Sequence, residues 1–563
     1  MSARPFVWEK AYPPGLSWDH PIATGLVTAL LDEAAREAGA RTALYFRSWR
    51  CSYAELKQRA DRLAAGLLAE GLDREQCIAL YLPNSPCHPV AFFGGLRTGA
   101  RLTHLSPLDA PRELAYKLRD SGARTVITTN LGGLLAGAVK LLEAGLVDRV
   151  IVGDDAAFGE PAPEREAIPA RPEVIPLDRL AETCEPPANW PQIDPADTAL
   201  LQYTGGTTGL PKAAILSHAN LTAAVSIYDA WFKALYPENR GWERVICALP
   251  LFHIYALTTI LLRGVRRHSE IILHLRFDAG QVLQDVEQKR ATAFPGVPTM
   301  WIALLNHPDL GKRDLSSLDR CSSGGAPLPV EVGRRFEEAT GRRLAGGWGL
   351  TETAPAGTNL LPFGEPRPGS IGIPLPGVEV RVVALDEPAR ALPPGEVGEL
   401  AVRGPNVTAG YWNRPEETAA TFAGGYLLTG DVGYMAEDGF FYLVDRKKDL
   451  IISGGFNVYP QMVEQAIYEH PAVQECIVVG IPDPYRGEAA KAFVTLKPAG
   501  EPFTLEALQA FLADKLGRHE IPRALEFRET LPRTAVGKLS RRALREEERL
   551  THAGPTEAAG PAA

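Results

Sequence analysis

The chain has 563 residues, of which 45% are hydrophobic and 23% are charged, a balance typical of folded globular proteins rather than disordered chains. Its net charge of −9 argues against non-specific binding of nucleic acid, but a local positive site for a small anion is compatible with it. A chain of this length predicts roughly two to four domains.

The N-terminal segment "MSARPFVWEKAYPPGLSWDHP" lacks the apolar core of a signal peptide. The longest nearly uncharged stretch, Ala248 to Leu262, is shorter than the roughly 20 apolar residues that span a bilayer, and it contains a proline and a histidine. We therefore expect no transmembrane segment and interpret the stretch as a buried helix or pocket wall. Peripheral contact with a membrane is left open.

The seven cysteines are scattered along the chain and form no CxxC pair. This pattern predicts thiols packed as small core residues, with neither a disulfide framework nor a zinc site. It fits a reducing compartment, and we expect a cytoplasmic protein.

Predicted helices and strands alternate at the start of the chain. An amphipathic helix begins after Ser52, which is placed to cap it, with Glu55 three residues on as the second half of a capping box. The elements that follow are a strand, helix, strand, helix and strand at residues 77–83, 87–99, 100–106, 111–122 and 125–129. Such alternation predicts an α/β architecture with largely parallel sheets.

Later segments change in character. Residues 395–412 combine short strands with Gly and Pro turns and predict a β-rich subdomain. Five consecutive charged residues, Asp445 to Asp449, interrupt an apolar pattern and suggest a domain boundary. The segment after it predicts a compact α+β unit with a helix, two strands and a helix at 460–470, 475–481, 491–497 and 504–516. We expect a large domain at 1–445, a hinge at 446–449, a small domain at 450–548 and a disordered tail at 549–563.

The stretch "YTGGTTGLPKAAILSH", residues 203–218, suggests phosphate binding. It fits neither a Walker A loop nor GxGxxG, because Pro211 precedes Lys212 and the residues after Lys212 form a strand pattern rather than a helix. Backbone N–H groups and threonine hydroxyls beside a lysine can nevertheless form an anion-binding concavity. Taken alone, the loop is also compatible with an ordinary solvent turn.

Four further segments accompany this loop along the chain. They are "GGWGLTET" at 346–353, "LTGDVG" at 428–433, "DRKKDLIISGGFNVYP" at 445–460 and "LPRTAVGKLSRR" at 531–542. In this order, the five segments resemble those of the adenylate-forming superfamily, which includes acyl-CoA synthetases, luciferases and peptide-synthetase adenylation domains. The resemblance extends from Trp8 to about Arg545. It implies a large N-terminal domain, with two α/β subdomains and a β-rich one, and a small mobile C-terminal domain.

Within the superfamily, the N-terminal segments resemble bacterial medium- and long-chain fatty acid–CoA ligases, including the dicarboxylate (pimeloyl) CoA ligase branch. The resemblance implies that a carboxylate attacks the α-phosphate of MgATP, which gives an acyl-adenylate and pyrophosphate. The thiol of CoA then displaces AMP. The implied small-molecule partners are a carboxylic acid, ATP and CoA, with Mg²⁺ as cofactor.

The resemblance also implies roles for individual residues. The catalytic residues would be Lys538, Glu352 and Thr204, and Mg²⁺ would bind Glu352 and Thr204. Lys538 would act between the acyl carboxylate and the α-phosphate, and Asp431 and Arg446 would contact the ribose. The phosphates would bind Thr204, Gly205, Gly206, Thr207, Thr208, Gly209 and Lys212. The rest of the nucleotide would meet Gly325, Ala326, Pro327, Gly347, Trp348, Gly349, Leu350 and Thr351.

Other residues would serve the acyl group and CoA. His253, Gly346 and Gly347 would line the acyl pocket. The hinge and the CoA-facing segment would include Lys447, Lys448, Ser453, Gly454 and Gly455. Two residues depart from the family pattern. Trp348 replaces the usual Tyr or Phe, which we expect to narrow the site, and Gly205 replaces a Ser or Thr, which we expect to weaken phosphate contacts modestly.

Alternative functions differ in what they require. An amino-acid-activating domain needs an aspartate near Phe252, and residues 250–254 contain no acid. An aryl-CoA ligase is separable only by the shape of the pocket. A non-catalytic nucleotide binder is opposed by the joint presence of Lys212, Glu352, Asp431, Arg446 and Lys538. A dicarboxylate substrate would need a cation or water at its far end; the segment Arg263–Glu270 offers cations, which we expect to face solvent.

Overall fold

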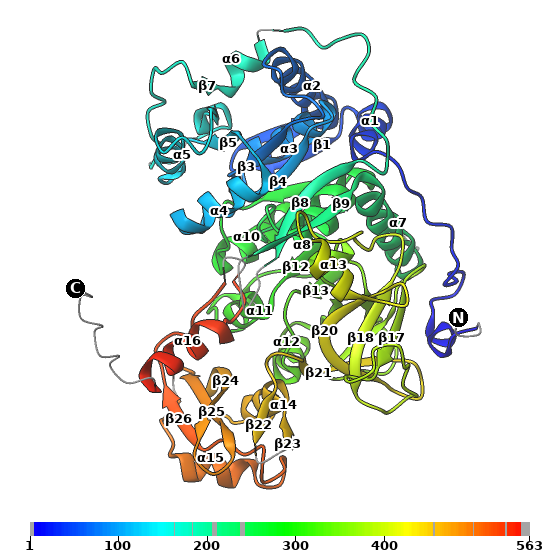
Figure 1. Cartoon of the computed structure of the whole chain (residues 1–563), viewed down its shortest axis with the longest axis vertical. Helices are drawn as coiled ribbons and strands as arrows, with labels where there is room; N and C mark the ends of the chain where they lie inside the picture. The colour runs from blue at the N-terminus through cyan, green and yellow to red at the C-terminus, as the bar shows by residue number, and fades with distance from the viewer. Residues whose placement is uncertain are drawn as a thin grey trace, which may run out of the picture.

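The structure is a computed structural model of the chain. It describes residues 5–160, 162, 164–182, 184–204, 211–236, 243–453, 456–498, 500–534 and 537–552. Figure 1 shows two neighbouring α/β regions, a β-rich region beside them, and a C-terminal unit set apart from the rest. This arrangement confirms the predicted fold class.

The first sheet has the strand order β7-β6-β5-β3-β4-β8-β9. All its neighbours run parallel except β8 and β9, which are antiparallel. Its strands are β3 (Cys77–Leu80), β4 (Arg101–His104), β5 (Thr125–Thr129), β6 (Arg149–Gly153), β7 (Val174–Pro176), β8 (Thr198–Thr204) and β9 (Lys212–Ser217). The strands predicted in this region are therefore confirmed.

Helices flank this sheet. They are α2 (Tyr53–Ala69), α3 (Cys87–Arg97), α4 (Pro111–Ser121), α5 (Leu134–Glu143) and α6 (Leu177–Glu182), with a short 3-10 turn, η2 (Asp155–Ala157). The predicted capping box of α2 is present, because the Ser52 hydroxyl accepts from the Glu55 N–H and the Glu55 carboxylate accepts from the Ser52 N–H. Local sequence thus fixes where this helix begins.

The second sheet has the order β17-β18-β20-β21-β16-β15-β14-β13-β12-β10-β11-β1-β2, with β19 on β20. Strands β10 to β14 pair in parallel, and pairing becomes antiparallel from β14–β15 onward. The α/β part comprises β1 (Thr42–Phe46), β2 (Trp49–Ser52), β10 (Arg244–Cys247), β11 (Glu270–Leu273), β12 (Ala293–Gly296), β13 (Arg320–Ser323) and β14 (Leu344–Trp348).

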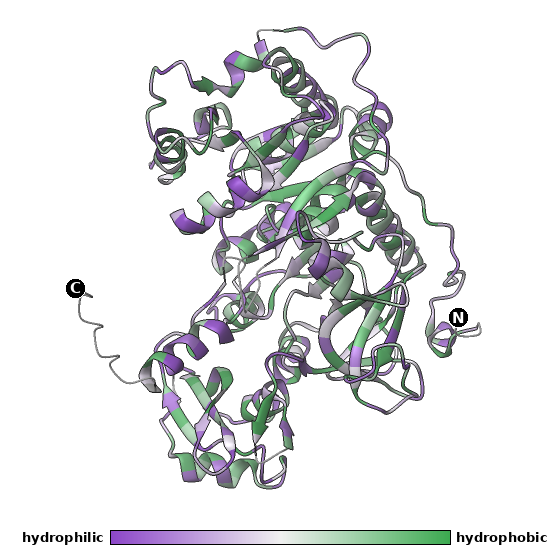
Figure 2. Ribbon diagram, viewed as in Figure 1, coloured by the Kyte–Doolittle hydropathy of each residue, from purple (hydrophilic) through white to green (hydrophobic). Residues whose placement is uncertain are grey.

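The β-rich part continues from the same sheet, as residues 395–412 predict. It comprises β15 (Thr358–Asn359), β16 (Ser370–Pro374), β17 (Glu379–Val383), β18 (Gly398–Arg403), β19 (Phe422–Ala423), β20 (Tyr426–Met435) and β21 (Phe441–Arg446). The helices of this half are η1 (Val7–Ala11), α1 (Val27–Ala38), α7 (His218–Leu235), α10 (Ala279–Lys289), α11 (Pro298–Leu305), η4 (Leu310–Lys312), α12 (Val330–Thr340), η5 (Thr351–Thr353) and α13 (Pro415–Thr421). Figure 2 shows hydrophobic residues gathered on the central strands.

The apolar stretch that follows β10 is buried, as predicted. It forms α8 (Ile254–Ala256), a π-helical turn η3 (Leu257–Leu262) and then α9 (Arg263–Arg266). Every residue of η3 is buried. Arg263 is buried as well, so the expectation that the cations of this segment face solvent is wrong for Arg263. Its guanidinium binds the carboxylate of Glu243, which explains why it can enter the core.

The C-terminal unit has its own sheet, ordered β23-β22-β25-β24 with β26 on β25. Its strands are β22 (Ile451–Ser453), β23 (Phe456–Val458), β24 (Val473–Asp483), β25 (Gly487–Leu496) and β26 (Ala524–Phe527). Its helices are α14 (Pro460–Tyr468), α15 (Leu505–Leu512) and α16 (Arg541–His552). Since α16 continues to His552, residues 549–552 are helical, which corrects the expected start of the tail; residues 553–563 lie outside the described residues.

Two expectations about the whole chain can be checked. All seven cysteines are free thiols, and six of them are buried while Cys184 is half-buried. Within the described residues, no helix combines the length and apolar character that crossing a bilayer requires.

Candidate active site

A cavity of about 2300 Å³ lies between the large domain and the C-terminal unit. Most of the predicted site residues that the structure describes line this one cavity. They are Thr204, Lys212, His253, Gly325, Ala326, Pro327, Gly346, Gly347, Trp348, Gly349, Leu350, Thr351, Glu352, Asp431, Arg446, Lys448 and Lys538. Residues more than 300 positions apart in sequence are thus brought to a common space.

The glycine-rich loop joins two antiparallel strands. Thr204, the last residue of β8, pairs with Lys212, the first residue of β9. This confirms the predicted strand-to-strand connection and explains the absence of a helix-opening Gly-Lys-Ser. The predicted phosphate-binding residues within the loop lie outside the described residues; they are Gly205, Gly206, Thr207, Thr208 and Gly209.

Lys212 belongs to a charged group at one end of the cavity. Its ammonium forms a salt bridge with Glu417 and lies 5.2 Å from the centre of the Tyr411 ring. The Tyr411 hydroxyl in turn donates to Glu352 Oε1 at 2.7 Å. Burial and the nearby Glu352 both raise the pKa of Tyr411, so its phenol stays protonated and remains a donor. No local sequence pattern marks Tyr411 or Glu417 as neighbours of this lysine.

Glu352 is suited to a hard cation that also binds phosphate. Tyr411 orients one carboxylate oxygen, and Glu352 and Thr204 line the same cavity. Within the described residues, no cluster of three or more His, Cys, Asp or Glu side chains could hold a metal ion by itself. The carboxylate of Glu352 and the hydroxyl of Thr204 are oxygen donors of the kind that Mg²⁺ takes, with water and substrate phosphates completing its shell.

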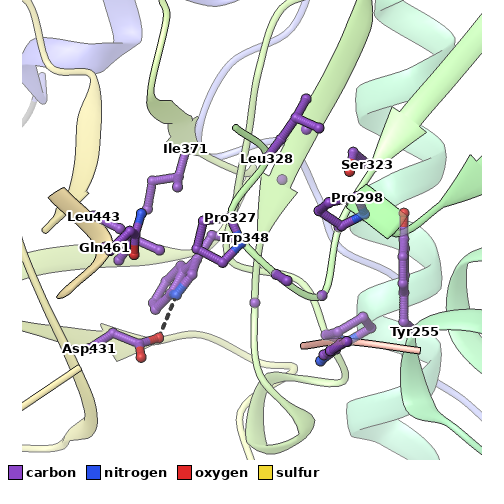
Figure 3. A pocket seen from close by; sticks show the side chains of 18 of the residues that line it. Tyr255, Pro298, Ser323, Pro327, Leu328, Trp348, Ile371, Asp431, Leu443 and Gln461 are labelled. Carbon is purple, nitrogen blue, oxygen red and sulfur yellow. Dashed lines mark hydrogen bonds between the residues drawn. The ribbon is translucent and has the colours of Figure 1, made fainter. Parts of the chain in front are cut away.

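Asp431 lies at another wall of the cavity, and Figure 3 shows the Trp348 ring nitrogen pointing to its carboxylate. Trp348 Nε1 donates to its Oδ2 at 2.7 Å, and Arg446 Nε donates to its Oδ1 at 2.9 Å. Arg446 is placed for this bond because it pairs with Asp431 across β20 and β21. Each carboxylate oxygen can accept more than one hydrogen bond, so Asp431 is held in one orientation and keeps acceptor capacity for the hydroxyls of a sugar.

Two glycines let the backbone come close at this site. A Cβ on Gly349 would lie 1.5 Å from the carbonyl oxygen of Pro355, so no other residue fits there without moving the chain. Gly325 has φ +77°, which favours glycine, and a Cβ on it would lie 2.8 Å from Cε of Lys538. The second contact shows that the lysine side chain lies directly against this segment.

Lys538 reaches the cavity from the C-terminal unit. The carbonyl oxygen of the preceding Gly537 accepts a hydrogen bond of 2.9 Å from the Thr299 hydroxyl of the large domain. Burial lowers the pKa of Lys538 to about 8, Arg446 acts in the same direction, and Asp431 opposes them. The ammonium is therefore poorly compensated, and an anion beside it would stabilise its charged form.

His253 stands at the start of α8 and caps it, since its Nδ1 accepts from the Tyr255 N–H at 3.2 Å. Burial, together with the positive charge of Lys538, lowers the pKa of His253 to about 3. The ring is therefore neutral at physiological pH. It presents a flat, uncharged surface to the cavity, which fits the predicted pocket wall.

A buried chain of side chains supports the His253 segment. Gln202 Nε2 donates to the carbonyl oxygen of Phe252 at 3.0 Å, and Gln202 Oε1 lies 2.9 Å from His104 Nδ1. The amide oxygen can only accept, so His104 carries its proton on Nδ1, and His88 Nε2–H donates to His104 Nε2 at 3.0 Å. Burial lowers the pKa of His104 to about 4, which keeps the chain neutral. Sequence reasoning missed these residues.

The described residues that the sequence predicts for the hinge and for CoA contact do not gather at one place in the structure. Lys447 Nζ binds Glu399 Oε2 at 3.0 Å and the Leu385 carbonyl oxygen at 3.2 Å, away from the cavity. Lys448 lines the cavity, and burial lowers its pKa, with Arg446 adding to the effect. Ser453 is buried in the C-terminal sheet, so its contact with CoA stays a prediction for another arrangement. Gly454 and Gly455 lie outside the described residues.

Comparison with protein families gives two matches. The model of the AMP-binding enzyme family matches residues 31–412, and that of the AMP-binding enzyme C-terminal domain matches residues 462–538. Together they account for most of the chain and for both sides of the cavity.

Curated relatives are similar over nearly their full length. A long-chain-fatty-acid–CoA ligase of Bacillus subtilis (strain 168) is 40% identical over 559 residues, which cover 97% of this chain and 98% of the relative. A feruloyl-CoA synthase of an Amycolatopsis species is 38% identical over 491 residues, which cover 87% and 92%.

Solved structures agree with this picture. The anthranilate CoA ligase AuaEII in complex with anthranoyl-AMP has a TM-score of 0.83 at 27% identity, covering 95% of this chain and 99% of that one. ATP-bound MatB from Rhodopseudomonas palustris has a TM-score of 0.83 at 29% identity, covering 94% and 100%.

Proposed function

The chain belongs to the AMP-binding enzyme family and is an acid–CoA ligase, and from this premise we propose that it activates a medium- or long-chain fatty acid or a dicarboxylic acid as an acyl-adenylate. The acyl group then passes to CoA, with release of AMP and pyrophosphate. The observation that carries the proposal is the shared cavity, where Lys212 and Glu352 stand at one end, Asp431 and Arg446 at a wall, and Lys538 opposite Gly325.

The first step brings two anions together. A carboxylate must approach the α-phosphate of a triphosphate, and their mutual repulsion must be offset for the oxygen to attack phosphorus. Lys538 can place its ammonium between them, and Lys212 can leave Glu417 to receive the phosphates next to the loop. Catalysis of phosphate chemistry rests mainly on such positioning and charge compensation.

The nucleotide would be held from the sides. Asp431 would accept the ribose hydroxyls while Trp348 and Arg446 fix its orientation, and the 325–327 segment would face the base. Glu352 and Thr204 would hold Mg²⁺, whose charge would neutralise the triphosphate. These assignments follow the sequence predictions, and the geometry supports them.

The second step needs a different arrangement. Lys538 lies against Gly325, in the arrangement that we propose for adenylate formation. The resemblance implies that the CoA-facing segment, residues 453–457, acts in another arrangement. We propose that the unit of residues 450–548 rotates about residues 446–449, with Lys448 as the pivot, so that Lys538 withdraws and CoA enters. The large domain would span residues 1–445.

The substrate class rests on the relatives. The Bacillus subtilis ligase acts on long-chain fatty acids by its name, which favours a fatty acid here. A dicarboxylic acid is part of the same proposal, and the feruloyl-CoA synthase and the anthranilate ligase keep an aromatic acid as the alternative. We place the reaction in the cytoplasm because free buried thiols fit a reducing compartment.

A panel of acids tests the proposal. The purified chain would be incubated with MgATP, CoA and acids ranging from acetate to stearate, together with ferulate, benzoate and pimelate. We expect acyl-CoA and AMP in equal amounts from at least one medium- or long-chain fatty acid or dicarboxylic acid, with lower kcat/KM for the aromatic acids. Absence of thioester and of AMP with every acid would overturn the proposal and favour a non-catalytic nucleotide binder.

A further inference from the structure

Two arginines share one glutamate at the inner end of the cavity. Arg263 donates to both oxygens of Glu243, at 2.9 and 2.8 Å, and Arg320 donates to the same two oxygens, at 2.9 and 3.3 Å. Both guanidiniums lie over the Phe232 ring, at 4.7 and 4.6 Å from its centre. Both arginines are buried, and Arg320 and Phe232 line the cavity.

The strand β13 places Arg320 relative to the reacting end. Side chains alternate along a strand, so Arg320 and Ser322 point to the same face, and both line the cavity. At about 3.3 Å per residue, Arg320 lies roughly 10 Å along the strand from Ser323, which directly precedes Gly324 and Gly325. Figure 3 shows Ser323 and Tyr255 beside this segment. Lys538 lies against Gly325, at one end of this stretch of chain. An acid whose carboxylate lies beside Lys538 would therefore point its far end toward Arg320.

The charges of this region do not balance. Glu243 supplies one negative charge for the two guanidiniums. Two nearby carboxylates have arginine partners of their own, since Asp229 pairs with Arg267 at 3.3 Å and Glu270 pairs with Arg244 at 3.4 Å. Among the described residues, the hydrogen-bonded group of Arg263, Arg320 and Glu243 therefore carries one more positive than negative charge. Burial lowers the pKa of Arg320, with Arg263 acting in the same direction, as expected for an undercompensated cation.

We propose that Arg320 is a specificity-determining residue that binds a second carboxylate at the far end of the acid, so that the enzyme prefers a dicarboxylic acid. This inference rests on the proposed ligase function and names its substrate class. Arg320 has five N–H donors and uses two for Glu243, and guanidinium and carboxylate are well matched. A methyl end at this position would leave the buried charge unpaired.

Three substrates of equal length test the inference on the unaltered enzyme. They are a medium-chain dicarboxylic acid, its monomethyl ester, and the corresponding monocarboxylic acid. We expect kcat/KM for the diacid to exceed that for the half-ester at least tenfold, because only the far charge differs. Equal or better kcat/KM for the half-ester and the monoacid would overturn the inference.

The variant Arg320→Met gives a second test. It leaves Arg263 and Glu243 as a balanced pair, so the buried cluster keeps no unpaired carboxylate. In Arg320→Met, we expect kcat/KM for the diacid to fall at least tenfold, while kcat/KM for the monoacid stays the same or rises. In Arg320→Lys, kcat/KM for the diacid should lie between the values of the unaltered enzyme and of Arg320→Met. Arg36→Gln, which removes an exposed charge from α1, serves as the matched control and should leave both substrates unchanged.

The outcomes separate this inference from the proposed function. Thioester formation from monoacids, with an unaltered substrate preference in Arg320→Met, would overturn the role of Arg320 and leave the ligase function intact. Absence of thioester from every acid would overturn the function itself. If thermal melting shows that Arg320→Met does not fold, the three-substrate comparison on the unaltered enzyme still tests whether the far carboxylate is recognised.

Discussion

Lys538 is the residue on which the proposed chemistry depends most. It comes from the C-terminal unit, yet its side chain lies against Gly325 of the large domain. Among the described lysines of the cavity, it differs from Lys212 in having no carboxylate partner at salt-bridge distance, whereas Lys212 binds Glu417. A lysine in this state has its charge available for a substrate anion.

Replacing Lys538 by Ala should separate the two half-reactions. We expect adenylate formation to fall by at least about 100-fold, since a preorganised cation at the reacting atoms is lost. Thioester formation from preformed acyl-adenylate and CoA should be unchanged. Rapid-quench assays of each half-reaction measure both, and equal loss in the two would contradict the assignment.

The protonation of Lys538 predicts a pH profile. Because its pKa in the free enzyme is lowered to about 8, the ammonium is present below that pH and is lost as the pH rises above it. We expect kcat/KM for adenylate formation to decline as the pH rises from 7 to 9. The thioester half-reaction should show no such decline, and a flat profile for adenylate formation would argue against a charged Lys538.

At the scale of elements, the segment between β10 and α8 is held from the neighbouring sheet. The buried Asn84 donates to the carbonyl oxygens of Cys247 and Leu249, at 3.2 and 2.8 Å, and accepts from the Leu251 N–H at 2.7 Å. Gln202 adds the bond to Phe252. Side chains after β3 and in β8 thus fix the backbone that carries His253.

The variant Asn84→Leu should destabilise the protein and displace this segment. It removes the Asn84 bonds to the Leu249 carbonyl group and the Leu251 N–H, while the Cys247 carbonyl group keeps its bond from the His274 N–H, and we expect this to cost about 2–4 kcal/mol in the free energy of unfolding. KM for the acid should rise because the pocket wall shifts. Urea unfolding and steady-state kinetics measure the two effects, with the exposed Asn306→Leu as control; an unaltered KM would mean that the segment is held by other contacts.

Elements whose signals are local could be predicted from the sequence. The start of α2 follows from Ser52 and Glu55 because a capping box involves only neighbouring residues. The strands β3 to β5 follow from short apolar runs separated by amphipathic helices. The turn at Pro211 and Lys212 likewise predicts a strand-to-strand loop, which the pairing of Thr204 with Lys212 confirms.

Contacts between distant segments could not be predicted in this way. Trp348 and Asp431 are 83 positions apart, and Tyr411 and Glu352 are 59 apart, so no local pattern links them. Arg263 was expected in solvent because a lone arginine is usually exposed, and only the fold brings Glu243 to it. The His88–His104 pair is equally invisible in sequence, since it joins α3 to the end of β4.

At the scale of the molecule, the two domains meet through a few polar contacts. Thr299 binds the Gly537 carbonyl group, and the Val330 N–H donates to Gln465 Oε1 at 3.2 Å. Arg541 of α16 forms salt bridges with Asp445, which precedes the hinge, and with Asp449, its last residue, at 3.4 and 3.6 Å. Such sparse polar contacts suit a unit that must leave this position in each cycle.

Thr299→Ala should therefore affect one step only. The hydroxyl helps to hold Gly537, and with it Lys538, in the cavity. Loss of one hydrogen bond of about 1 kcal/mol predicts a roughly fivefold slower adenylate formation. The thioester half-reaction should keep its rate. Thr340→Ala, at the end of α12, is the matched control; a change in the thioester step alone would contradict the closed arrangement as the adenylating one.

The transfer of oxygen tests the central claim most directly. The enzyme would convert a carboxylic acid labelled with ¹⁸O in both carboxylate oxygens, and mass spectrometry would locate the label. Attack of the carboxylate on the α-phosphate predicts one ¹⁸O in AMP and none in pyrophosphate. Unlabelled AMP, or label in pyrophosphate or orthophosphate, would contradict the acyl-adenylate route.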